Sequence, residues 1–212
     1  MASPAPPAAP RSITPLGITV LALLVEDDMH PYEMLRLLEQ RRRDRIVSVT
    51  KGAVYHTVAC RESQGYIAEV GVDREGNRPE RTSYSVRPLG REILPAWVAE
   101  ELPRIDRPAA FRVALAEAHN VPLARVTELL TVRGEALREQ LETLRDGISA
   151  AHDRGTPEQF LIEFERERTL LDADLQWNTA LLERFSTTPI PWGEDGHSDP
   201  AQYALLRKAA QL

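Results

Sequence analysis

The feature that most constrains this chain is the spacing of apolar residues in its second half. Between residues 122 and 151 they recur at intervals of 7, 4, 3 and 4, the 3.5-residue period of helices that pack side by side. A second apolar stripe follows Thr156-Pro157. The spacing predicts two long helices, each about 45 Å long, joined by the turn Asp153-Arg154-Gly155 into an antiparallel hairpin. The first stripe comprises Leu130, Leu137, Leu141, Leu144 and Ile148, and the second comprises Phe160, Phe164, Leu171, Leu175, Leu182 and Phe185.

These two stripes are wider than one partner helix would cover, so the pattern favours self-association into a homodimer. The alternative is a monomer in which the hairpin packs on the rest of the chain. Gly134 interrupts the first stripe, and a glycine at that position is expected to weaken the helix locally.

The first half of the chain carries start signals for several short helices. Eight of the first ten residues are Ala or Pro, so residues 1–12 are expected to form a disordered arm. Thr14, His30 and Thr50 each precede a helical apolar pattern, which predicts three short helices. The third is expected to end at Gly65, since glycine is a common helix stop.

Two stretches rich in β-branched and aromatic residues come next, over 66–72 and 82–86, with a polar run between them. They predict a β-hairpin with a long basic tip. Three helices followed by such a hairpin are typical of a winged helix-turn-helix. A fourth helix is expected over 88–102, kinked at Pro95.

The expected fold is therefore mainly α. A winged helix-turn-helix with its β-hairpin spans residues 13–102, and a linker covers 103–108. A helical dimerisation domain with long helices then spans 108–186, beginning with a short helix at 111–119. Residues 187–212 form a C-terminal tail that ends in an amphipathic stretch.

Several function classes find no support in the sequence. The single cysteine, Cys60, allows neither an internal disulfide nor a cysteine-rich zinc site, which suggests a reducing, cytoplasmic setting. No apolar stretch approaches the roughly 20 residues that span a bilayer, so no membrane association is expected. We find no nucleotide-binding glycine loop, nucleophile elbow or paired metal-binding histidines, so we expect no catalytic residues, metal or cofactor.

The start of the predicted third helix has the composition of a DNA-contacting element. Gly52 and Ala53 are small enough to let a helix N-terminus approach a phosphate backbone closely. Charged and hydrogen-bonding side chains surround them, and the hairpin tip adds arginines that could reach an adjacent phosphate strand. The ordinary alternative is that these are solvated side chains of an exposed helix and loop. The candidate DNA-binding residues are Lys51, Gly52, Ala53, Tyr55, His56, Thr57, Arg74, Arg78 and Arg81.

The distribution of charge agrees with a DNA-binding first half. The whole chain has a net charge of −6, which taken alone argues against nucleic acid as a partner. Residues 36–91, however, hold 12 basic and 7 acidic side chains, a net charge of +5, which leaves −11 for the rest. The sequence thus places a basic segment beside an acidic helical one.

The order of short motifs in residues 14–94 resembles the PadR family of transcriptional regulators. The second half is similar to that of the longer PadR subfamily, which carries a helical C-terminal dimerisation region, and the likeness covers about residues 12–186. The motifs are Pro15-Leu16-Gly17, His30-Pro31-Tyr32-Glu33, Gly52-Ala53-Val54-Tyr55-His56, Glu62-Ser63-Gln64-Gly65-Tyr66-Ile67, Tyr84-Ser85-Val86, Pro88-Leu89-Gly90-Arg91-Glu92 and, in the second half, Phe111-Arg112-Val113-Ala114-Leu115-Ala116 with Trp177.

This resemblance implies a dimeric repressor that binds an inverted-repeat operator in double-stranded DNA and releases it when a small aromatic or hydrophobic ligand binds. Tyr32, Trp97 and Phe111 are the candidates for lining a ligand pocket, with ordinary core packing as the alternative.

One departure from the family pattern lies in the third helix, where Cys60-Arg61 replaces the usual arginine and leucine. Arg61 stands seven residues after Val54, at a place expected to be apolar. We expect its stem to follow the core edge and its guanidinium to reach solvent, because burying an unpaired charge is costly. The departure motivates an alternative function, a dimeric protein-interaction module that keeps the winged-helix fold without DNA recognition.

Overall fold

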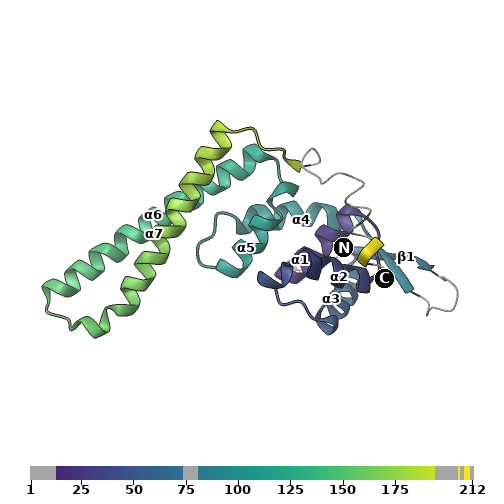
Figure 1. Ribbon diagram of the computed structural model, residues 1–212, viewed down its shortest axis with the longest axis horizontal. Coiled ribbons are helices and arrows are strands. Elements are labelled where there is room, and N and C mark those ends of the chain that lie inside the picture. Colours follow the sequence, from purple (N-terminus) through teal and green to yellow (C-terminus); the bar gives the residue numbers. More distant parts are fainter. Residues whose placement is uncertain (1–12, 74–80, 194–204, 206–207, 211–212) are drawn as a thin grey trace, which may run out of the picture. The chain divides into compact units, whose positions relative to one another are not determined.

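The structure is a computed structural model that describes residues 13–73, 81–193, 205 and 208–210 (Figure 1). It consists of two compact units that meet in sequence between Trp97 and Val98. The first unit also includes helical residues near the C-terminus, Leu205 and 208–210. The expected disordered arm, residues 1–12, lies outside the described residues. Within the described part, no helix is both long and apolar enough to span a membrane.

Three short helices open the first unit, each begun by a side-chain cap, which the sequence predicts for the first and the third. They are α1 (Pro15–Glu26), α2 (Pro31–Gln40) and α3 (Lys51–Ser63). Thr14 Oγ1 accepts from the Gly17 amide at 3.2 Å, and Thr50 Oγ1 accepts from the Ala53 amide at 3.2 Å. At α2 the cap is His30, whose Nδ1 accepts from the Tyr32 amide at 3.0 Å. Each cap satisfies one of the amides that a helix N-terminus leaves without a partner.

The wing is a two-stranded antiparallel sheet of β1 (Ile67–Asp73) and β2 (Arg81–Val86). Its register pairs Ile67 with Val86, and an irregularity lies between Glu69 and Gly71. Met29 and Tyr84 exchange backbone hydrogen bonds of 3.2 and 3.1 Å, which tie β2 to the segment between α1 and α2. Three helices and this anchored hairpin make a winged helix-turn-helix, as the sequence predicts.

Helix α4 (Pro88–Glu101) begins directly against the base of the wing, and Gly90 permits this approach. A Cβ atom at Gly90 would lie 2.3 Å from the carbonyl oxygen of Tyr66 and 2.9 Å from Cγ2 of Val86. Because both distances are far below van der Waals contact, only glycine fits here without a shift of the backbone.

Arg61 corrects an expectation from the sequence. Its side chain is buried instead of reaching solvent, with only 6% of the residue exposed. The guanidinium lies against Gly17, where a Cβ would be 3.2 Å from Arg61 Cζ, and over the ring of Tyr66 at 6.0 Å from its centroid. Nε and Nη1 have no hydrogen-bond partner among the described residues. Because glycine has no side chain, Gly17 leaves space for the guanidinium of Arg61. Burial lowers the pKa of Arg61.

The second unit contains helices and no strand among its described residues. It contains α5 (Pro108–Ala116), the 3₁₀ turn η2 (Ala118–Asn120), α6 (Leu123–Asp153), the 3₁₀ turn η3 (Glu158–Phe160) and α7 (Ile162–Thr187). The long hairpin of α6 and α7 was expected, but α7 begins later than Thr156-Pro157. A tight turn with hydrogen bonds from Phe160 to Pro157 (3.0 Å) and Leu161 to Glu158 (2.8 Å) precedes it and buries Leu161.

A polar contact at Gly134 joins the two helices of the hairpin, α6 and α7. A Cβ on Gly134 would lie 2.9 Å from Nδ2 of Asn178, and that nitrogen donates to the carbonyl oxygen of Leu130 at 2.9 Å. Gly134 therefore serves helix packing by letting Asn178 reach the backbone of α6. Of the α7 side chains, all of which are described, only Asn178 is buried. The apolar side chains of α7 are therefore at least partly exposed.

Candidate nucleic-acid interface

The first two turns of α3 expose most of the residues proposed to contact DNA. Lys51, Gly52 and His56 are exposed and Tyr55 is 37% exposed, whereas Ala53 is half-buried. A Cβ on Gly52 would meet nothing within 4 Å. The N-terminus of α3 is therefore open to a large polyanion, and its amide groups and dipole favour negative charge there.

Tyr55 is held in place by its neighbours. Its ring and the His30 ring pack edge to face, with centroids 6.2 Å apart and planes at 78°. Lys51 Nζ lies 5.9 Å from the Tyr55 ring centroid. The aromatic contact and the nearby ammonium each restrict the rotamers of Tyr55. Its hydroxyl group therefore occupies a limited set of positions.

Thr57 does not join this exposed surface. It is only 8% exposed and lies on the buried face of α3, with Val54, Val58 and Arg61. These four residues follow the i, i+3, i+4, i+7 spacing of a helix's core stripe. That spacing is the signal in the sequence that separates Thr57 from the exposed candidates.

Cys60 has a partner that the sequence reasoning missed. Its Sγ lies 3.5 Å from Nε2 of His56, one turn earlier on α3. Residues four apart on a helix are neighbours, so the i, i+4 spacing of His56 and Cys60 was the available signal. The thiol is half-buried beside an exposed residue of the proposed DNA surface.

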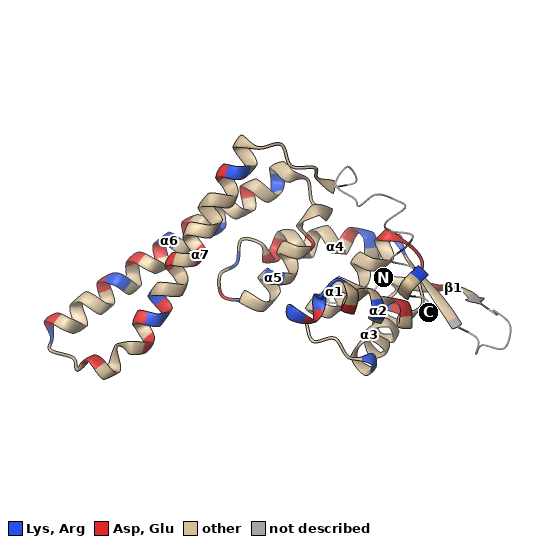
Figure 2. Cartoon of the chain, in the orientation of Figure 1, with Lys and Arg blue, Asp and Glu red and all other residues tan. Residues whose placement is uncertain are grey.

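The arginines that follow α2 differ in their surroundings. Arg41 forms a bidentate ion pair with Glu26, at 2.6 and 2.7 Å, which joins the ends of α1 and α2. Arg42 has a left-handed backbone conformation with φ of 54°, and the 3₁₀ turn η1 (Arg43–Arg45) follows it. Arg45 is exposed, so this turn adds positive charge to the unit that contains α3 (Figure 2).

No cluster of His, Cys, Asp or Glu suited to a metal ion occurs among the described residues.

The wing arginines are described only in part. Arg74 and Arg78 lie outside the described residues. The backbone of Arg81 begins β2, opposite Asp73. The structure therefore describes the two strands on either side of the wing tip, β1 and β2.

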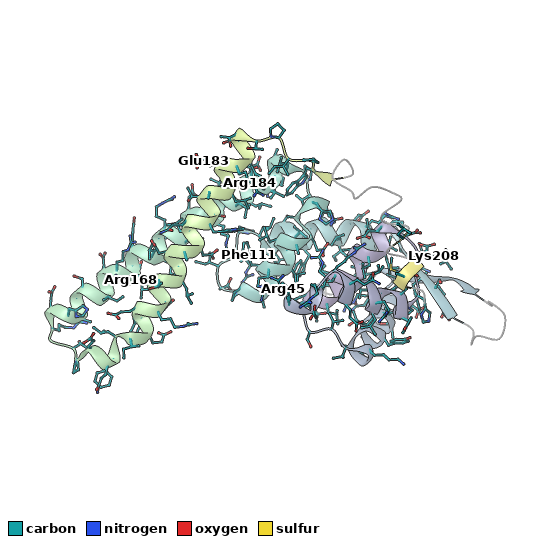
Figure 3. All side chains as sticks on the ribbon, viewed as in Figure 1. Arg45, Phe111, Arg168, Glu183, Arg184 and Lys208 are labelled. Carbon is teal, nitrogen blue, oxygen red and sulfur yellow. The ribbon has the colours of Figure 1, made fainter. Side chains whose placement is uncertain are left out.

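The ligand candidates fall in both units. Tyr32 is half-buried and Trp97 is 8% exposed, both in the first unit. Phe111, labelled in Figure 3, lies in the second, where Arg133 Cζ is 3.5 Å from its ring centroid and Trp177 meets it edge-on at 6.1 Å. Arg133 is itself fixed by Asp174 at 2.5 Å and by the carbonyl oxygen of Arg104. Phe111 thus packs inside the second unit.

Comparison with known proteins gives structural neighbours only. No protein-family model and no curated protein matches the chain. PadR of Bacillus subtilis, solved in complex with operator DNA, is 13% identical, with a TM-score of 0.39, over 80% of this chain and 98% of that one. The protein smu.1604c of Streptococcus mutans is 17% identical, with a TM-score of 0.37, over 80% of this chain and 95% of that one. At these scores we derive function from the chain's own residues.

Proposed function

We propose that the protein is a PadR-like transcriptional regulator that binds double-stranded DNA through α3 and the wing. The observation that carries this proposal is the open N-terminus of α3, where Lys51 and Gly52 are exposed and nothing lies within 4 Å of a Cβ at Gly52. A helix of 13 residues with a capped, uncrowded and basic N-terminus suits the phosphate backbone and the major groove.

Each residue of this surface has a distinct role in the proposal. Lys51 pairs with a phosphate, while Gly52 and Ala53 let the backbone amides come close to the same strand. Tyr55 and His56 carry the hydrogen-bonding groups that can reach base edges. Arg74, Arg78 and Arg81 on the wing contact the phosphates of a neighbouring segment. Thr57 has no part in the contact, because it is buried.

The proposal includes a homodimer formed through the second unit. Helix α7 spans 26 residues and buries only Asn178. Several of its large apolar side chains are exposed, including Ile162 at 62%, Leu170 at 51% and Trp177 at 39%. Covering such a face with a second copy of the chain removes apolar surface from water. A two-fold dimer presents two α3 helices, which matches an inverted-repeat operator.

The proposed activity is repression of transcription in the cytoplasm, relieved when a small aromatic or hydrophobic molecule binds. Ligand binding would change the affinity for DNA only as far as it favours one arrangement of the dimer over another. Tyr32 and Trp97 remain the candidates in the first unit for contact with such a molecule.

Fluorescence anisotropy of a labelled duplex from upstream of the protein's own gene tests DNA binding, with a scrambled duplex as reference. We expect tighter binding to the upstream duplex, weakened in Lys51→Gln and Tyr55→Ala. Arg168→Gln is the matched control, since it removes one exposed positive charge from α7 (Figure 3). If an intact dimer ignores both duplexes at low salt, the alternative of an interaction module without DNA recognition replaces the proposal.

A further inference from the structure

A cavity of about 520 Å³ lies between α6 and α7, next to the turn that joins them. Its wall is mostly apolar. Leu161 and Ala151 are buried at 4% and 8% exposure, while the rings of Phe160 and Phe164 are 61% and 45% exposed. The cavity therefore connects the packed interior of the hairpin with its surface. Figure 1 shows α6 and α7 moving apart towards this turn.

The cavity owes part of its space to Gly147, a glycine near the C-terminal end of α6. Gly134 in the same helix is explained by packing, because Asn178 occupies the place of its side chain. Gly147 differs, since a Cβ there would meet nothing within 4 Å. Glycine weakens a helix interior, and no described neighbour in this chain requires one at position 147.

The charged side chains around the cavity are of both signs. Residues 138–168 contain eight acidic and five basic side chains, a net charge of −3. Glu167 on the wall already accepts a hydrogen bond from Gln140 Nε2 at 3.2 Å. Arg154, also on the wall, is basic, so the wall itself has no excess of negative charge, and the two phenylalanine rings favour contact with another ring.

We propose that this cavity is a binding site for a small, apolar, ring-containing molecule. Its volume lies within the range of small-molecule pockets, about 300–1,000 Å³, and its apolar wall with a few polar groups fits that class. The polar groups are the hydroxyls of Thr143 and Thr156, the amide of Gln140, the guanidinium of Arg154 and the carboxylate of Glu167. The site lies within the second unit and does not depend on DNA binding by the first.

Nile red, an uncharged dye that fluoresces in apolar surroundings, tests the proposal with the full-length protein. Gly147→Leu fills the cavity, and Gly147→Ala is its matched control, since it also removes the helix glycine but adds one methyl group. We expect the wild type and Gly147→Ala to bind the dye. We expect Gly147→Leu to bind at least about tenfold more weakly, a change of about 1.4 kcal/mol.

Thr143→Trp is a second cavity-filling variant, at an exposed position, and decides the outcome if Gly147→Leu does not fold. Sedimentation of each variant reports its association state. Wild-type protein that does not bind Nile red would overturn the proposal, as would equal binding by the filled variants. A filled variant that loses self-association but keeps dye binding would assign this face to a second copy of the chain instead.

Discussion

Replacing Arg61 with leucine should make the protein more stable, which is unusual for a change at a buried position. The guanidinium lies between α1 and α3 with 6% of the residue exposed. Its Nε and Nη1 have no hydrogen-bond partner among the described residues. Leucine is shorter, is apolar and can occupy the space beside Gly17 without leaving a donor unsatisfied.

The size of the effect follows from the groups that change. A buried donor without a partner costs about 1–3 kcal/mol, and Arg61 has two. Losing the contact with the Tyr66 ring, 6.0 Å from Arg61 Cζ, offsets about 0.5–1 kcal/mol of that gain. The cavity left by the shorter side chain reduces the gain further. We expect a net increase of about 1–4 kcal/mol, as found when buried charges are replaced by apolar residues.

Urea denaturation followed by circular dichroism measures this change, with hydrogen exchange of the α1 and α3 amides to assign it to the first unit. Arg61→Lys is the matched control. It keeps a buried positive charge and should be no more stable than the wild type. If Arg61→Leu were less stable than the wild type by 1 kcal/mol or more, the guanidinium must have a stabilising partner and the reasoning would be refuted.

Three further predictions follow from other contacts in the structure. Gly90→Ala should destabilise the first unit by about 1–3 kcal/mol or more through overpacking, whereas Gly71→Ala, with nothing within 4 Å of its Cβ, should not; equal urea midpoints would contradict this. Gly134→Ala should displace Asn178 from the Leu130 carbonyl; the buried groups left without partners cost about 1–3 kcal/mol, more than the gain of up to about 1 kcal/mol in helix propensity, which should be visible as faster amide exchange in the hairpin. Alkylating Cys60, the single cysteine, with N-ethylmaleimide should weaken DNA binding; unchanged anisotropy titrations would place DNA elsewhere.

The fold of the first unit could be predicted because its signals are local. The caps Thr14 and Thr50 and the helix start at His30 are each predicted from a few neighbouring residues, as is the alternation of the wing strands. The position of Arg61 could not be predicted in this way. Its burial depends on the missing side chain of Gly17, and only the packing of α1 on α3 brings these two residues together.

The same distinction applies to the second unit. Heptad spacing predicts the long hairpin, because the period of a helix stripe is a property of the sequence alone. The late start of α7 depends on burying Leu161 in a tight turn. The role of Gly134 depends on Asn178, which stands on the other helix. In the candidate site, the burial of Thr57 and the contact between His56 and Cys60 could both have been predicted from the sequence. Helix spacing alone separates the buried face of α3 from the exposed one and brings residues four apart together.

The salt dependence of DNA affinity tests most directly whether the N-terminus of α3 contacts the phosphate backbone. The logarithm of the association constant is measured against the logarithm of salt concentration for the wild type, Lys51→Gln and Arg168→Gln. Removing one phosphate contact should reduce the slope by about one. We predict that reduction for Lys51→Gln and an unchanged slope for Arg168→Gln. Equal slopes for the wild type and Lys51→Gln would contradict the proposed interface.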